Sequence, residues 1–259
     1  VRFETGNSVA SVVPMMTDNP ELDGDDRAIR ALGDSDYRGA ADAYVLGAYG
    51  TLAGYEGFRR HAFTDRTQAG RAVCHLVRAA VCHRIAGDDA GARNRAMQGA
   101  LVAVDMKGGR TGVDVAACDE LVGHCRVAAD DTERASEAYD RAATGYEDAA
   151  LDDHAGATTR PLLQAGTDLL THLSRPDDVE WDDIHGTGGD ALARRVRFVR
   201  SRLPSMVKAR VDAGTLHAPR GSTEYGTDFR CPECSSTDVN YVAEAVLCLR
   251  CDAPIEFRS

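Results

Sequence analysis

Small and apolar residues recur every three or four positions through most of the chain, which is the spacing of helices that bury one side. In residues 36–49, DYRGAADAYVLGAY, one stripe carries a small, an aromatic and a small residue: Ala40, Tyr44, Gly47. The same order returns further along the chain, at Ala135, Tyr139, Ala142. The pattern therefore predicts two helices that bury Tyr44 and Tyr139 against their neighbours.

A weaker copy of this order, without the aromatic residue, lies between the other two, at Ala92, Ala96, Gly99. Each copy follows an acidic turn, and the pattern resembles the second helix of tetratricopeptide-type repeats. The copies are spaced more widely than the regular period of about 34 residues. The resemblance, over residues 25–175, is therefore to the irregular, longer-helix relatives of that family. It implies antiparallel helices that offer a groove to a peptide or protein partner.

Three further segments have a helical period, namely 65–86, 113–129 and 158–173. Pro161 falls in the first turn of the last one, where its missing N–H costs nothing. With the flanking segments we expect about eight helices and no strand before residue 235. The fold class is predicted to be mainly α, with an antiparallel helical-repeat domain over residues 21–213.

The segment 190–203 is predicted to be a helix with a narrow apolar stripe, made of Leu192, Val196, Val199, Leu203. Arginines occupy the remaining arc, at Arg194, Arg195, Arg197, Arg200, Arg202. We expect Pro204 to interrupt this helix and a short helix to continue to residue 213. Two interpretations of the arginines stay open. They form either a solvated face neutralised by nearby aspartates or a contact surface for nucleic acid or an acidic partner.

Four cysteines near the end of the chain form two close pairs, C-x2-C-x13-C-x2-C, at Cys231, Cys234, Cys248, Cys251. Each pair can bind a metal from one tight turn, and four thiolates form the tetrahedral set that structural Zn²⁺ prefers. Two strand-like stretches in the spacer, 238–242 and 245–249, can bring the pairs together as a hairpin. Residues 255–257 can add a third strand.

This cysteine pattern resembles the zinc-ribbon or rubredoxin-like family. The resemblance implies one structural zinc ion in a small C-terminal β-ribbon over residues 230–259, joined to the helical body by a linker over 214–229. A domain of this size needs metal binding to supply most of its folding free energy. A rubredoxin-like iron site and disulfides are the alternatives.

The other four cysteines also have two interpretations. Cys74 and Cys82 are separated by about 12 Å along one helix, too far to share a metal by themselves. Together with Cys118 and Cys125 of another helix they could form a second metal site. The simpler interpretation is that they are buried thiols, because free cysteine packs as a small apolar side chain.

The charge of the chain bears on its possible partners. The chain has 41 acidic and 30 basic residues, a net charge of −11, and Lys107 and Lys208 are its only lysines. This composition resembles that of proteins from salt-loving archaea. At about 1 M salt the Debye length is about 3 Å, so an acidic surface there does not exclude a nucleic-acid partner. The basic residues concentrate in segment 190–210.

No run of about 18 or more apolar residues and no charged leader with a cleavage site occurs, so we expect a cytoplasmic protein without a membrane partner. Met15 and Met16 follow a patternless start, and we expect residues 1–20 to be disordered or wrongly assigned to the chain. Nucleophile sets, P-loops and dinucleotide-binding fingerprints are absent. We therefore expect no catalytic residues.

The sequence as a whole favours a non-enzymatic scaffold or adaptor. Such a protein would bind a protein partner through its helical-repeat body and a structural zinc ribbon. The alternative is a nucleic-acid-associated factor of transcription or translation that uses residues 190–210 and the ribbon. The sequence leaves the oligomeric state open.

Overall fold

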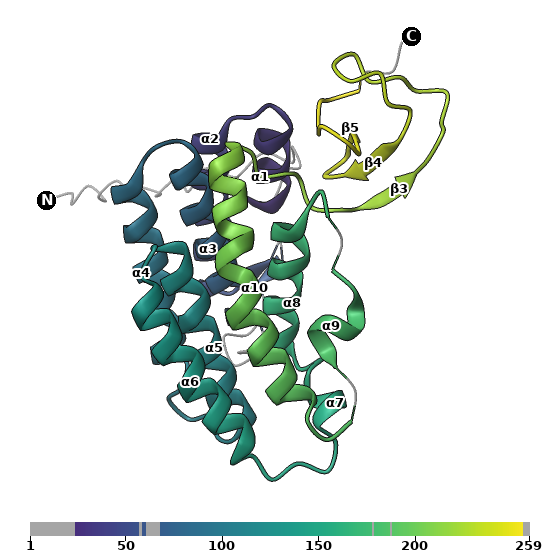
Figure 1. The fold of residues 1–259 in the computed structure, drawn as a ribbon. Coiled ribbons are helices and arrows are strands. Elements are labelled where there is room, and N and C mark those ends of the chain that lie inside the picture. The colour runs from purple at the N-terminus through teal and green to yellow at the C-terminus, as the bar shows by residue number, and fades with distance from the viewer. Residues whose placement is uncertain (1–23, 57–58, 61–67, 178, 187, 256–259) are drawn as a thin grey trace, which may run out of the picture.

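The computed structural model describes residues 24–56, 59–60, 68–177, 179–186 and 188–255. Within these ranges the chain forms ten helices, namely α1 Gly24–Gly33, α2 Tyr37–Leu52, α3 Ala69–Ile85, α4 Asp89–Asp105, α5 Val113–Ala128, α6 Thr132–Glu147, α7 His154–Ala157, α8 Pro161–Ser174, α9 Trp181–His185 and α10 Ala191–Ala213. The strands are β1 Tyr55–Glu56, β2 Arg59–Arg60, β3 Ser222–Glu224, β4 Val239–Val242 and β5 Ala245–Cys248. The fold is mainly α with a small C-terminal β-sheet (Figure 1), as predicted.

Three antiparallel helix hairpins, α1–α2, α3–α4 and α5–α6, follow one another along the chain. Each turns through one residue with positive φ, at Ser35, Gly87 and Asp130. The next residue is an aspartate that caps the second helix through its side chain, at Asp36, Asp88 and Asp131. The N–H of each aspartate also donates to a carbonyl five residues earlier, in the first helix. The acidic turns are thus one structural unit used three times.

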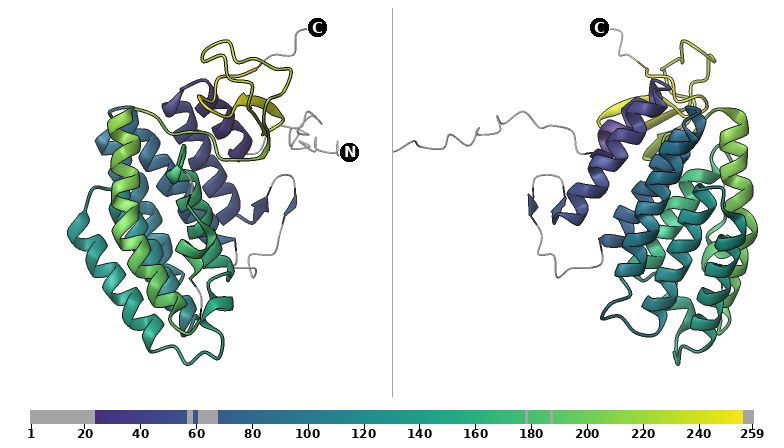
Figure 2. Two further views of the ribbon diagram at one scale, coloured as in Figure 1. Left: turned by 45° about the vertical axis from the view of Figure 1, so that its right-hand side comes forward. Right: turned by 90° about the vertical axis from the view of Figure 1, so that its left-hand side faces the viewer.

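The second layer of the body comes from the later helices. α8 packs on α3 and α5, while α10 packs on α3, α5, α6 and α8. Figure 2 shows the hairpin helices side by side, with α8 and α10 along one side of them. Both α3 and α5 are therefore covered on most sides, and most of their residues are buried. In contrast, α2 and α4 keep one face open to solvent.

Small residues allow the hairpin helices to approach closely. Tyr44 in α2 and Tyr139 in α6 are only 2% and 1% exposed, so the predicted burial of both tyrosines is confirmed. A Cβ added to Gly123 of α5 would lie 2.5 Å from the Tyr139 ring. No larger side chain fits there without displacing the ring, because carbon atoms pack at about 3.5–4.0 Å.

The predicted break at Pro204 is wrong, because α10 continues through it to Ala213. A proline inside a helix removes one backbone hydrogen bond. Here the buried stripe continues on both sides of the proline, through Val199, Leu203 and Val207. Packing of that stripe against the body holds the two halves of α10 in line.

The prediction of no strand before residue 235 is also wrong. β1 and β2 form a short antiparallel pair after α2, and β3 lies inside the segment predicted to be a linker. The C-terminal sheet is antiparallel, in the order β3-β4-β5. Its hairpin β4–β5 matches the prediction, and Val239 pairs with Cys248.

The third strand of this sheet is β3 rather than residues 255–257. Pro254 forms an isolated bridge with Leu247, and the Ile255 N–H donates to the Val246 carbonyl at 2.8 Å. Residues 256–257 lie outside the described ranges, as do residues 1–20 of the predicted N-terminal segment. Among the described helices, none is both long and apolar enough to cross a membrane.

Candidate metal centre

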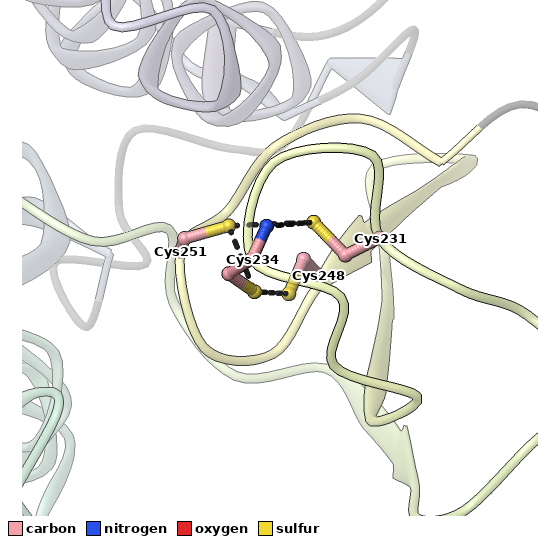
Figure 3. A group of neighbouring side chains, drawn as sticks. All are labelled: Cys231, Cys234, Cys248 and Cys251. Atoms are coloured by element: carbon pink, nitrogen blue, oxygen red, sulfur yellow. Dashed lines mark hydrogen bonds between the residues drawn. The ribbon is translucent and has the colours of Figure 1, made fainter.

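The four cysteines of the C-terminal ribbon converge on one point. Their sulfur atoms all lie within 4.8 Å of one another, and three of the separations are 3.5 Å. Figure 3 shows Cys231 and Cys234 approaching from one loop and Cys248 and Cys251 from the other. Sulfurs at the corners of a zinc tetrahedron are separated by about 3.8 Å, because the Zn–S bond is about 2.3 Å. The arrangement fits a four-coordinate metal.

Each cysteine pair lies on a turn with the same backbone geometry. The residue after the second cysteine has a φ of 60° in both turns, at Ser235 and Asp252. Its N–H donates to the carbonyl of the first cysteine, at 3.1 Å to Cys231 and at 2.9 Å to Cys248. We call these turns the first knuckle, residues 231–235, and the second knuckle, residues 248–252.

The thiols of the cluster do not ionise alike. Burial raises the pKa of Cys231, but N–H groups of Cys234 and Glu233 and the neighbouring thiols lower it to about 7. Burial and the other three thiols raise the pKa of Cys251. Four thiolates this close repel one another, so a bound cation is needed before all four can act as ligands.

Disulfide pairing does not fit these sulfurs. A disulfide requires an S–S distance of about 2.05 Å, and all eight cysteines are free thiols. The ribbon's own core is small, with Cys231, Val239, Val246, Cys248 and Ile255 as its buried residues. So few apolar side chains bury little surface, and a metal ion held by the four cysteines would add to the stability of this small core.

The ribbon docks on the helical body through its second knuckle. Arg175, which follows α8, is 2% exposed and donates to the carbonyls of Ala218 and Leu249 and to the Asp252 carboxylate. The Leu247 side chain belongs to the main hydrophobic core rather than to the ribbon's own, and a Cβ added to Gly33 of α1 would lie 3.2 Å from it. The predicted linker therefore holds buried contacts instead of a free tether.

Replacing Arg175 with alanine is expected to loosen the docked ribbon without removing its metal ligands. The change leaves two carbonyls without their buried donor and removes one of the two partners of Asp252, the other being His217. It should therefore lower the free energy of unfolding by about 1–3 kcal/mol. Amide hydrogen exchange over residues 216–255 should speed up while the metal content stays constant. Arg250→Ala is the matched control, because Arg250 is an exposed residue of the same knuckle that pairs with Asp238 and should contribute about 0–1 kcal/mol. Unchanged exchange in Arg175→Ala would contradict the docking role.

The arginines of α10 do not form one outward face. Arg195 is 0% exposed, so its predicted place among the solvent-facing arginines is wrong. It lies beside Val199 on the helix surface and points into the body. Arg200 pairs with Asp140, and Arg197 lies 3.9 Å from Asp190. Arg194 and Arg202 are exposed and have no ion-pair partner within the described ranges.

Arg195 belongs to a buried polar cluster that the sequence did not reveal. Its guanidinium donates to both carboxylate oxygens of Glu120, at 2.9 to 3.3 Å, and also to Thr167 and the Leu163 carbonyl at 2.9 Å. The Tyr146 hydroxyl donates to Glu120 at 2.9 Å. Burial raises the pKa of Glu120, yet Arg195 and His124 hold it below its usual value. Glu120 and Arg195 find hydrogen-bond partners within the cluster, and core residues surround it. This arrangement indicates a structural role.

The remaining cysteines are isolated from the ribbon, and the described residues hold no second group of metal ligands. Cys74, Cys82, Cys118 and Cys125 are buried thiols of the helical core. Burial raises the pKa of each, that of Cys74 to about 12 and that of Cys118 to about 11. This protonated, apolar state agrees with the interpretation that they pack as small hydrophobic side chains.

Comparison with known proteins adds no family to this description. No protein-family profile, curated protein or solved structure matches the chain significantly.

Proposed function

We propose that the protein is a non-enzymatic adaptor that binds a protein partner on the outer face of α2 and α4, with a zinc ribbon as a second, metal-stabilised module. The observation that carries the proposal is a group of exposed apolar side chains on this face, here called the α2/α4 patch: Leu46, Tyr49, Leu101, Val104. Leu46 is 53% exposed and Leu101 is 66% exposed. Large apolar side chains that gather at the surface are typical of protein interfaces.

The patch spans two helices that both pack on α3 and are joined by one side-chain hydrogen bond. The Tyr49 hydroxyl of α2 donates to Gln98 of α4 at 3.1 Å, so the two exposed faces lie next to each other. Because α2 and α4 run in the same direction, Leu46, one turn before Tyr49, and Leu101, one turn after Gln98, lie on either side of this link. The expected partner presents an apolar stripe of its own, as an amphipathic helix does when it lies across a pair of helices.

Aspartate substitutions in the patch test this function. Leu46→Asp with Leu101→Asp should abolish recovery of the partner in a pull-down at molar salt, because a charge placed in an apolar interface is buried without a partner. Trp181→Asp, on α9 at the other side of the body (Figure 1), changes another exposed large side chain and should leave recovery intact. Equal recovery with the patch variant and the native protein would contradict the proposal.

Zinc is proposed as the metal because four thiolates in a closed tetrahedron are its usual structural ligands, with no vacant position for a substrate. A rubredoxin-like iron site would use the same ligands. Elemental analysis of the purified protein separates the two metals.

A nucleic-acid partner is the second candidate, favoured by the exposed Arg194 and Arg202, which no carboxylate neutralises in the described structure. If Arg194 contacts a phosphate, binding to nucleic acid should weaken with salt, and Arg194→Ala should reduce the logarithmic salt slope by about one. Arg200→Ala is the control with a smaller expected effect, because Asp140 already pairs with Arg200. Partner recovery that survives nuclease and an unchanged slope would remove this candidate.

A further inference from the structure

A cavity of about 170 Å³ lies in the helical body, away from the four cysteines. α1, α2, α3, α8 and the segment after α10 contribute to its wall. The wall has an unusual number of charged and hydrogen-bonding side chains for its size: Asp25, Tyr44, Arg71, His75, Arg78, Asp168. Neither the metal centre nor the α2/α4 patch uses them.

Most charges on the wall are already compensated. One Asp25 oxygen lies 2.9 Å from His75 Nε2, and the other lies 3.2 Å from an Arg71 guanidinium nitrogen. Burial raises the pKa of Asp25, but His75, Arg78 and Arg71 together hold it well below its usual value. Asp25 is therefore an ionised group with both oxygens engaged.

Arg78 and Asp168 are the two charged side chains of this wall that form no ion pair within the described residues. The Arg78 Nε donates to His172 Nδ1 at 3.1 Å, and the Arg78 guanidinium lies 6.0 Å from the centre of the Tyr44 ring. His172 is buried and holds its own orientation by donating from Nε2 to the His217 carbonyl at 2.7 Å. The guanidinium plane is thus fixed, while its two terminal NH₂ groups have no hydrogen-bond partner among the described residues.

Tyr44 and Asp168 are neighbours of Arg78 on this wall and have opposite effects on a bound anion. Tyr44 also lines the cavity, and its hydroxyl is buried without a hydrogen-bond partner. Asp168 is exposed, accepts a hydrogen bond from Gln164 at 2.8 Å and makes no ion pair with Arg78. A buried donor without an acceptor, such as the Tyr44 hydroxyl, is costly in a folded protein. This hydroxyl and the two NH₂ groups of Arg78 favour an anionic occupant, whereas the carboxylate of Asp168 opposes it.

We propose that this cavity binds a small oxyanion, a carboxylate or a phosphate, with Arg78 as the anchoring residue. A guanidinium can donate two parallel hydrogen bonds to two oxygens of such a group, which gives both strength and orientation. The size of the cavity suits a small metabolite rather than a polymer. The site is independent of the proposed adaptor role, so either can fail without the other.

Inorganic phosphate and acetate are the probes that test the site, each titrated into the full chain at constant ionic strength. The Arg78 Nε–Hε resonance in ¹H–¹⁵N spectra should shift and saturate with at least one of the two anions, and the anion that binds more tightly identifies the class. Arg78→Gln should weaken the affinity at least about tenfold. Arg202→Ala removes the same charge from an exposed site and should leave the affinity unchanged.

Asp168→Asn should change the anion affinity in the opposite direction. Removal of a negative charge beside the cavity should tighten anion binding, by about twofold for an exposed carboxylate. This variant keeps the proposal testable if Arg78→Gln fails to fold. The proposal is overturned if neither anion gives a saturable shift, if Arg202→Ala weakens binding as much as Arg78→Gln, or if Asp168→Asn does not strengthen it.

Discussion

Arg195→Ala is expected to lower the free energy of unfolding by about 3–5 kcal/mol, because it leaves the Glu120 carboxylate buried without its cationic partner. Glu120 is 1% exposed and Arg195 is 0% exposed, so water cannot replace the lost hydrogen bonds without opening the core. The Tyr146 hydroxyl would remain as a donor to Glu120. Denaturant unfolding followed by circular dichroism measures the loss.

The loss should depend on pH in a defined direction. In the native protein Arg195 keeps the pKa of Glu120 below its unfolded value, so the pair stabilises the fold above about pH 4 and this contribution is lost as the pH falls. In Arg195→Ala burial dominates and raises the pKa of Glu120, so protonation relieves the cost as the pH falls. The difference between the two proteins should therefore shrink toward acidic pH.

Two further variants distinguish the loss of the ion pair from a general destabilisation of α10. Arg194→Ala changes the neighbouring, exposed arginine and should alter the free energy of unfolding by less than about 0.5 kcal/mol. Replacing both members, by Glu120→Leu with Arg195→Met, should recover part of the loss, because no unpaired charge stays buried. A single substitution at Arg195 that costs no more than Arg194→Ala would contradict the buried pair.

Cys248→Ser is expected to unfold the ribbon and leave the helical body intact. Without one of its four thiolates the cluster loses most of its affinity for the metal, and the ribbon core is too small to fold alone. The helical circular dichroism signal should remain, while residues 222–255 should lose their dispersed amide resonances. Because the second knuckle carries the contacts to Arg175, the ribbon should also leave the body.

The matched control for this variant is a cysteine outside the metal group. Cys118→Ser changes a buried thiol of α5 and should lower the stability of the body without changing the metal content. If Cys248→Ser left the ribbon folded, the metal would not be the source of its stability.

The sequence was most informative where structure depends on local signals. The acidic turns predicted the starts of α2, α4 and α6, because an aspartate at the helix N-cap acts through its own backbone neighbourhood. The spacing of the four cysteines predicted both knuckles and the hairpin β4–β5 for the same reason. Each of these features depends on residues close to one another in the chain.

The failures occurred where a distant residue decides the outcome. Arg195 looked like its exposed neighbours, because the carboxylate that draws it inward is Glu120, on a helix far back in the chain. Pro204 looked like a helix break, because the body that holds α10 straight comes from several other helices. The three residues of β3 looked like part of the linker, because they form a strand only by pairing with β4. Local propensity cannot report such partners.

The claim on which the ribbon and its docking depend is that the four cysteines hold one zinc ion. Elemental analysis of the purified protein tests it most directly. The account predicts about one zinc per native chain, and none in Cys248→Ser. A native protein without metal, or one that carries iron in place of zinc, would contradict it.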